Sequence, residues 1–157
     1  MEPGRTIRRA LGWALALTLA ACGGGTAGDG NDAPSAALAV DQPTAQALVD
    51  TARAGTAALW PGGTVSGSTV VGQPSVTVVG NEVVIESGTL HSDFTGGWLA
   101  LDYSGWTYDS RTGVASAGTI TITGITGNSA AITIGPGGYS VAITVFGLTV
   151  RFDVPFT

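Results

Sequence analysis

The 157-residue chain contains no lysine, and its six basic side chains are all arginines. Three of them lie within the first nine residues, so only Arg53, Arg111 and Arg151 remain in the rest of the chain. Beyond residue 21, the chain has ten acidic residues and only these three arginines, which gives this part a net charge of −7. Because nucleic-acid binding and attraction to anionic lipid both depend on clustered lysine and arginine, we expect neither partner for this chain.

Cysteine and histidine are equally scarce, since Cys22 and His91 are the single representatives of each. One cysteine cannot form an internal disulfide, and zinc-type sites need three or four nitrogen and sulfur ligands. No serine lies in a Gly-x-Ser-x-Gly motif, and no lysine follows the glycine-rich segment 135–138. The composition therefore predicts no metal, no cofactor and no catalytic residue of these common kinds.

The uncharged segment 10–21 is too short for a membrane-spanning helix, which needs about 20 apolar residues. Arg5, Arg8 and Arg9 precede this segment, and the small residues Ala20 and Ala21 end it. A positive start, an apolar stretch of about 7–15 residues and small residues before a cleavage site are the features of a signal peptide. We therefore predict that residues 1–21 form a signal peptide.

The run Leu19-Ala20-Ala21-Cys22 resembles the lipobox of bacterial lipoproteins, and the resemblance covers residues 1–23 only. It implies that Cys22 is lipidated, becomes the new N-terminus and anchors the protein to a membrane of the bacterial cell envelope. Gly23, in place of the aspartate linked to inner-membrane retention, implies the outer membrane, on its periplasmic or its surface face. The alternative interpretation is an ordinary secretory signal with an incidental cysteine.

Two short segments precede the main domain. Residues 22–40 are rich in glycine, alanine and aspartate, and this composition predicts a flexible tether. Residues 41–58 are predicted to form an amphipathic helix, with Asp41 as the N-cap and Pro43 in the first turn. Apolar residues at helical spacing form its buried stripe: Ala45, Leu48, Val49 and Ala52.

Residues 59–157 form the main domain, in which apolar and polar residues alternate from Thr64 onward between glycine-rich turns. The expected turns at 80–81, 135–138 and 146–147 set the strand register, because a slip of one residue would expose a whole apolar face. They pair Val78 with Val83, Ile134 with Tyr139, and Val145 with Leu148. The sequence predicts a mainly β fold: an antiparallel meander, either a sandwich or an open barrel, with one short N-terminal helix. Its apolar face needs a cover, either a second sheet or the helix.

Aromatic residues are concentrated in the segment 96–109. If Leu99, Leu101 and Tyr103 point into the core, strand alternation turns Trp98 and Asp102 outward. Aromatic side chains beside a carboxylate can hold a sugar ring or a peptide. The candidate ligand-binding residues are therefore Trp98, Asp102, Trp106 and Tyr108. The alternative is that these aromatic residues fill the core or pair across strands.

Three functional hypotheses follow from these observations. The first is a non-catalytic envelope lipoprotein whose β domain binds a partner protein or a glycan. The second is an envelope hydrolase or carbohydrate-active enzyme that uses scattered carboxylates, or His91 with Asp93 two residues further on, although a histidine in such a polar turn is usually just exposed. The third is a structural subunit that pairs through an exposed strand edge, which requires an uncovered outer strand without bulges.

Overall fold

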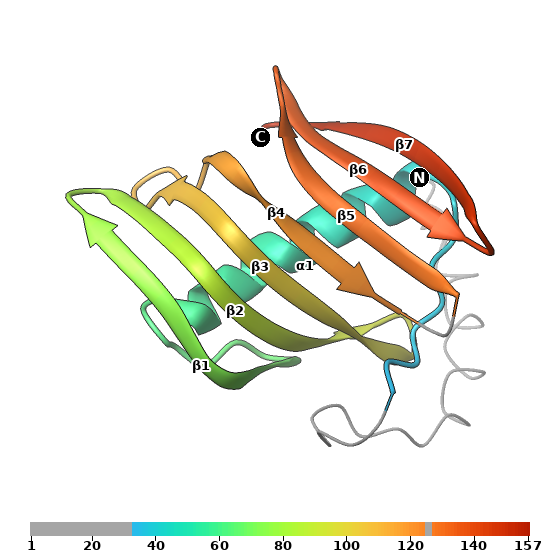
Figure 1. Cartoon of the computed structure of the whole chain (residues 1–157), viewed down its shortest axis with the longest axis horizontal. Coiled ribbons are helices and arrows are strands. Elements are labelled where there is room, and N and C mark those ends of the chain that lie inside the picture. Colours follow the sequence, from blue (N-terminus) through green and yellow to red (C-terminus); the bar gives the residue numbers. More distant parts are fainter. Residues whose placement is uncertain (1–32, 125–126) are drawn as a thin grey trace, which may run out of the picture.

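The computed structural model describes residues 33–124 and 127–157, and the predicted signal peptide and Cys22 lie outside the described residues. One helix precedes seven strands in this part of the chain (Figure 1). Their bounds are α1 (Gln42–Leu59), β1 (Ser68–Val79), β2 (Glu82–Phe94), β3 (Gly97–Asp109), β4 (Ala115–Thr123), β5 (Asn128–Gly135), β6 (Gly138–Val145) and β7 (Leu148–Pro155).

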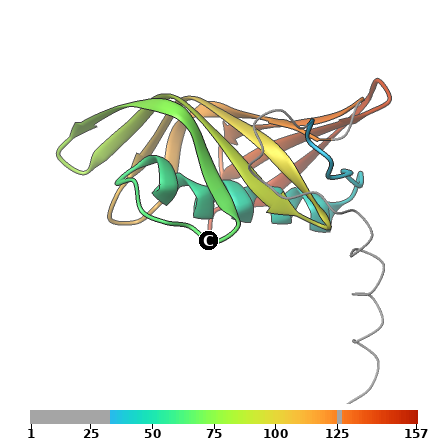
Figure 2. The same cartoon turned by 90° about the horizontal axis from the view of Figure 1, so that it is seen from below.

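All seven strands belong to one antiparallel sheet, in which each strand pairs with its neighbours in the sequence. The sheet curves around α1, which lies across its concave face (Figure 2). The mainly β class, the antiparallel meander and the single helix are thus confirmed. The sheet is open, and within the described residues no second sheet completes a sandwich, because the helix covers the apolar face instead.

Helix α1 follows the expected pattern closely. The Asp41 carboxylate accepts a hydrogen bond from the Thr44 amide at 2.8 Å, and Pro43 occupies the first turn. The predicted stripe of Ala45, Leu48, Val49 and Ala52 is fully buried against the sheet. In the part of the chain described here, no helix has the length and apolar character needed to cross a membrane.

The predicted register is confirmed at all three hairpins. Val78 lies opposite Val83, Ile134 opposite Tyr139, and Val145 opposite Leu148. The inward side chains of the last three strands, such as Val141 and Ile143, form the core beneath α1. The opposite face carries threonine, serine and alanine in neighbouring positions, as in the row Thr119, Thr133 and Ser140.

Bulges interrupt the first four strands at about the same level of the sheet. Pairing shifts after Val71 in β1 and between Ser104 and Thr107 in β3, where Gly105 has a φ of +60°. Gly118 in β4 has a φ of +104°, and its Cα lies too close to the backbone of Gly105 for any side chain. An extra residue in a strand reverses the alternation of inward and outward side chains. In β3 the inward positions after the bulge therefore become 106 and 108.

The last part of the predicted tether is packed rather than free. The amides of Ser35 and Ala36 donate to the carbonyl of Trp98, each at 3.1 Å, and Ala36 and Leu38 are buried. The Ala36 carbonyl and the Leu38 side chain lie close to Gly124, which directly follows β4. The prediction of a flexible tether is therefore wrong for residues 35–38, because the polar composition of the segment masked this short alternating apolar pattern.

Candidate functional site

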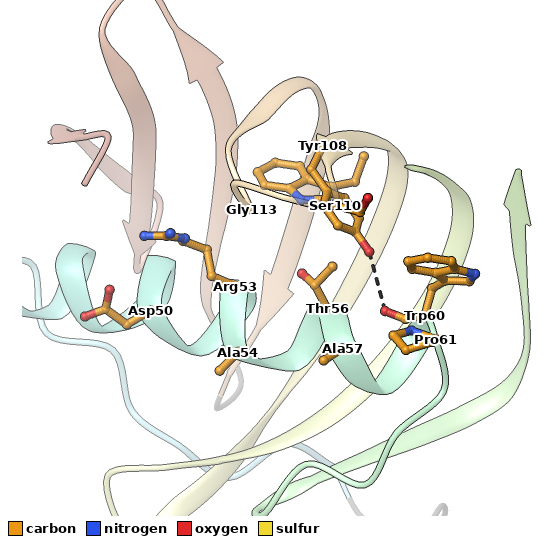
Figure 3. Close-up of a pocket in the computed structure, with 11 residues that line it drawn as sticks. Asp50, Arg53, Ala54, Thr56, Ala57, Trp60, Pro61, Tyr108, Ser110 and Gly113 are labelled. Carbon is orange, nitrogen blue, oxygen red and sulfur yellow. Dashed lines mark hydrogen bonds between the residues drawn. The ribbon is translucent and has the colours of Figure 1, made fainter. Parts of the chain in front are cut away.

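A pocket of about 480 Å³ lies between the C-terminal half of α1 and the end of β3 with its following turn (Figure 3). Helix residues 50–57 form one side, Trp60 and Pro61 form the end, and Trp106 with Tyr108 forms the wall. Ser110 and Gly113, from the connection to β4, complete the rim. Pockets for small ligands typically measure about 300–1,000 Å³ and combine apolar walls with a few polar groups.

The wall is aromatic because the β3 bulge turns two rings toward the helix. Trp106 is held between Tyr139, stacked at 6.1 Å between ring centroids, and Tyr103, which meets it edge-on at 6.4 Å. The Tyr108 hydroxyl donates to the carbonyl of Trp60 at 3.4 Å. Burial raises the pKa of the Tyr108 phenol, so this group stays a neutral hydrogen-bond donor at neutral pH.

The polar rim comes from one flank of α1. Arg53 donates to the side-chain hydroxyl of Thr157 at 3.3 Å, and the Asp50 carboxylate accepts from Gln46 at 3.0 Å. Figure 3 shows Arg53 and Thr56 on one flank of the helix and Trp60 at its end, below the β3–β4 connection. The pocket therefore offers a guanidinium donor and a carboxylate acceptor at one end and the half-buried indole of Trp60 at the other.

The four predicted ligand-binding residues are divided between two places. Trp106 and Tyr108 line the pocket, whereas Trp98 and Asp102 lie on the opposite face of the sheet. The expected outward platform is not formed, because Trp98 and Trp106 are only 3% and 2% exposed. The physical reason differs for the two: the bulge turns Trp106 inward, and His91 from β2 covers Trp98. Asp102 is exposed, and it accepts a hydrogen bond from Thr89 at 2.7 Å.

No known protein family, curated protein or solved structure matches this chain.

His91 is not the exposed histidine expected from its polar surroundings. Its ring lies 4.1 Å from that of Trp98, and it is buried on the face of the sheet away from the pocket. Burial lowers the pKa of His91, and the charge of Asp102 opposes this shift in part. Among the described residues its Nδ1 atom has no hydrogen-bond partner, so the expected orienting carboxylate of Asp93 does not hold it.

The remaining acidic residues form no cluster at the pocket. Glu86 accepts hydrogen bonds from Ser75 and Thr77 at 3.1 and 2.7 Å on the exposed side of β1 and β2. Within residues 33–124 and 127–157, no group of three histidine, cysteine or acidic side chains could hold a metal ion. The lining instead combines aromatic rings with the side chains of Arg53 and Asp50.

Sequence reasoning did not identify Arg53, Thr56 and Trp60 as site residues. Arg53 and Thr56 are three residues apart, which places them on one flank of the predicted helix, whereas Trp60 follows the end of the helix with an extended backbone. That signal could have been found, but it shows only that the residues are neighbours. It does not show that the end of β3 faces them, because that contact depends on the bulge at Gly105.

Proposed function

We propose that this chain is a lipid-anchored, non-catalytic binding module of the bacterial cell envelope, and that the pocket between α1 and β3 binds a glycan. The observation that carries the proposal is the pocket itself, with Trp60, Trp106 and Tyr108 forming apolar walls and Arg53 and Asp50 on its rim. A sugar ring has both apolar faces and hydroxyl groups, and these match an aromatic wall and charged hydrogen-bonding groups.

The shape of the site favours a ligand of limited size over a protein surface. Its volume of about 480 Å³ is suited to one or two sugar units. The aromatic wall is fixed in advance, since Trp106 is packed between two tyrosines and Tyr108 is hydrogen-bonded to the helix end. A wall that is already ordered loses little conformational entropy when a ligand binds.

The pocket is tested by titrating the protein with soluble peptidoglycan fragments and with neutral oligosaccharides, using tryptophan fluorescence and calorimetry. Trp60→Ala and Arg53→Gln should each weaken binding at least tenfold, which corresponds to about 1.4 kcal/mol. The matched control is Phe146→Ala, which removes an 83% exposed aromatic ring far from the pocket. If Phe146→Ala weakens binding as much as Trp60→Ala, the pocket is not the binding site. If the protein binds none of these saccharides, glycan binding is also contradicted.

The anchor is tested separately, by fractionating cells that express the full-length chain or its Cys22→Ser variant. The lipobox-like run ending at Cys22 supports lipidation, and two or more acyl chains give stable membrane attachment. The wild type should then be found with outer membranes, and Cys22→Ser should be soluble in the periplasm or remain uncleaved at the inner membrane. A Cys22→Ser protein that still partitions with outer membranes would contradict the anchor but not the pocket.

A further inference from the structure

The two outer strands of the sheet differ in how well they could pair with another strand. β1 is interrupted by shifts in pairing, contains Pro74, and has a positive φ at Gly72. Such bulges and prolines are common devices that protect sheet edges. β7 pairs with β6 without interruption, its one proline, Pro155, is its last residue, and no other strand of the described chain covers its outer side. β7 is therefore the open edge.

The hairpin geometry shows which backbone groups of β7 are free. Phe146 and Gly147 both have positive φ, as in the two-residue turns that begin with a hydrogen-bonded pair, here Val145 and Leu148. Even-numbered residues of β7 thus bond to β6, in agreement with the hydrogen bond from the Phe156 amide to the Gly137 carbonyl. The amides and carbonyls of Thr149, Arg151 and Asp153 point outward, and the Asp153 carbonyl accepts from the Gln42 side chain at 3.0 Å.

The same strand exposes apolar side chains that the helix does not reach. Leu148 is 75% exposed and Val150 is 42% exposed, although both alternate onto the concave, apolar face with the half-buried Phe152. On the convex face the exposed side chains are Thr149, Arg151 and Asp153. A partner strand would therefore need apolar residues on one face and groups complementary to Arg151 and Asp153 on the other.

We propose that β7 pairs antiparallel with β7 of a second copy of this chain, with the two-fold axis at Phe152. In this register Arg151 lies directly opposite Asp153 of the second copy, on the convex face, and the relation is repeated by symmetry. Val150 lies opposite Val154 of the second copy on the concave face. Opposite charges and apolar pairs directly across an antiparallel ladder are both stabilising.

This register also uses the free backbone groups. Arg151 and Asp153 both direct their amide and carbonyl outward, so facing residues exchange two backbone hydrogen bonds. In the dimer the Asp153 carbonyl accepts a hydrogen bond from a backbone amide of the second copy, in place of the exposed hydrogen bond from the Gln42 side chain. Shifting the axis to Arg151 would place two arginines opposite each other, which is destabilising. The strand thus complements itself best about Phe152.

The test is sedimentation velocity of the soluble Cys22→Ser protein recovered from the periplasm, in which no lipid holds copies together, from about 1 to 100 µM. The wild-type β7 sequence should give a concentration-dependent dimer. Arg151→Asp or Asp153→Arg should raise the dimer dissociation constant at least tenfold, because each places like charges opposite each other. The double variant, with both charges exchanged, should restore dimerisation.

Arg111→Asp is the control, because it makes the same change of charge on the exposed turn after β3 and should leave the dimer intact. A chain that remains monomeric up to about 100 µM would overturn the proposal and leave the edge for a strand of another protein. A dimer that both single variants leave unchanged would also overturn it. Saccharide binding measured on the same variants distinguishes these failures from a failure of the pocket, because the two sites share no residue.

Discussion

A methyl group should be poorly tolerated at Gly118, where the bulged segments of β3 and β4 lie against each other. A Cβ built on Gly118 would lie against the carbonyl oxygen of Gly105 and 2.5 Å from the Cα of Trp106, and both neighbours are backbone. Gly105 also has a positive φ, of +60°, but a Cβ there would meet nothing within 4 Å. A comparison of the two glycines therefore separates the free-energy cost of a positive φ from the free-energy cost of the close backbone contact.

The expected losses of stability follow from this difference. Gly105→Ala should cost about 1–2 kcal/mol, the usual price of a left-handed conformation for a residue with a side chain. Gly118→Ala should cost this amount and a further 1–3 kcal/mol, because rigid backbone must move to admit the methyl group. Urea unfolding, followed by tryptophan fluorescence, measures both as shifts of the transition midpoint. Equal losses for the two variants would refute the argument that strand approach, rather than φ alone, requires glycine at 118.

Two further predictions concern buried polar groups. Tyr103→Phe removes the buried hydrogen bond, 2.6 Å long, from the phenol to the Ala52 carbonyl of the helix. The variant should lose about 1 kcal/mol of unfolding free energy in the same urea assay. An unchanged midpoint would contradict a stabilising role for this bond. The pKa of His91 in the folded state lies below its ordinary 6.5, so below pH 6.5 the unfolded chain binds more protons than the folded chain. The contribution of His91 to stability is therefore complete above pH 6.5 and should fall as the pH drops toward the folded pKa. His91→Phe should flatten this dependence between pH 7 and about 5.5 while keeping the packing on Trp98, whereas an equally steep profile in the variant would show that another group titrates.

Strand register could be predicted from the sequence because two constraints agree. In the last two hairpins, the turns at 135–138 and 146–147 fix which residues face each other, and the apolar alternation selects the same pairing. The helix was equally readable, since its cap at Asp41 and its stripe through Leu48 depend only on local spacing. Local chemistry and the global fold favour the same answer in these elements.

The candidate site was not predictable in the same way, because it depends on a single extra residue. Simple alternation along β3 continues from Tyr103 to 105 and 107, whereas the bulge makes Trp106 and Tyr108 the inward residues. Gly105 and Gly118 signal that a bulge is available, but either glycine could equally belong to a turn. The burial of Trp98 agrees with the alternative that these aromatic residues fill the core or pair across strands. The residue that covers it was not predicted, because His91 comes from β2 and only the pairing of Asp93 with Trp98 brings them together.

The two proposed surfaces lie toward opposite ends of α1, and this arrangement has a consequence for binding. Gln42, at the N-terminal end, contacts β7, whereas Trp60 just beyond the C-terminal end closes the pocket. None of the residues that line the pocket belongs to β7, and a dimer through β7 holds the two pockets at a fixed separation. A glycan with repeated units can then occupy both, and linked sites can raise the apparent affinity by about 10²–10⁴ without any new contact. Disaccharide fragments should accordingly bind wild type and Arg151→Asp alike, whereas long glycan chains should bind the dimeric wild type more tightly.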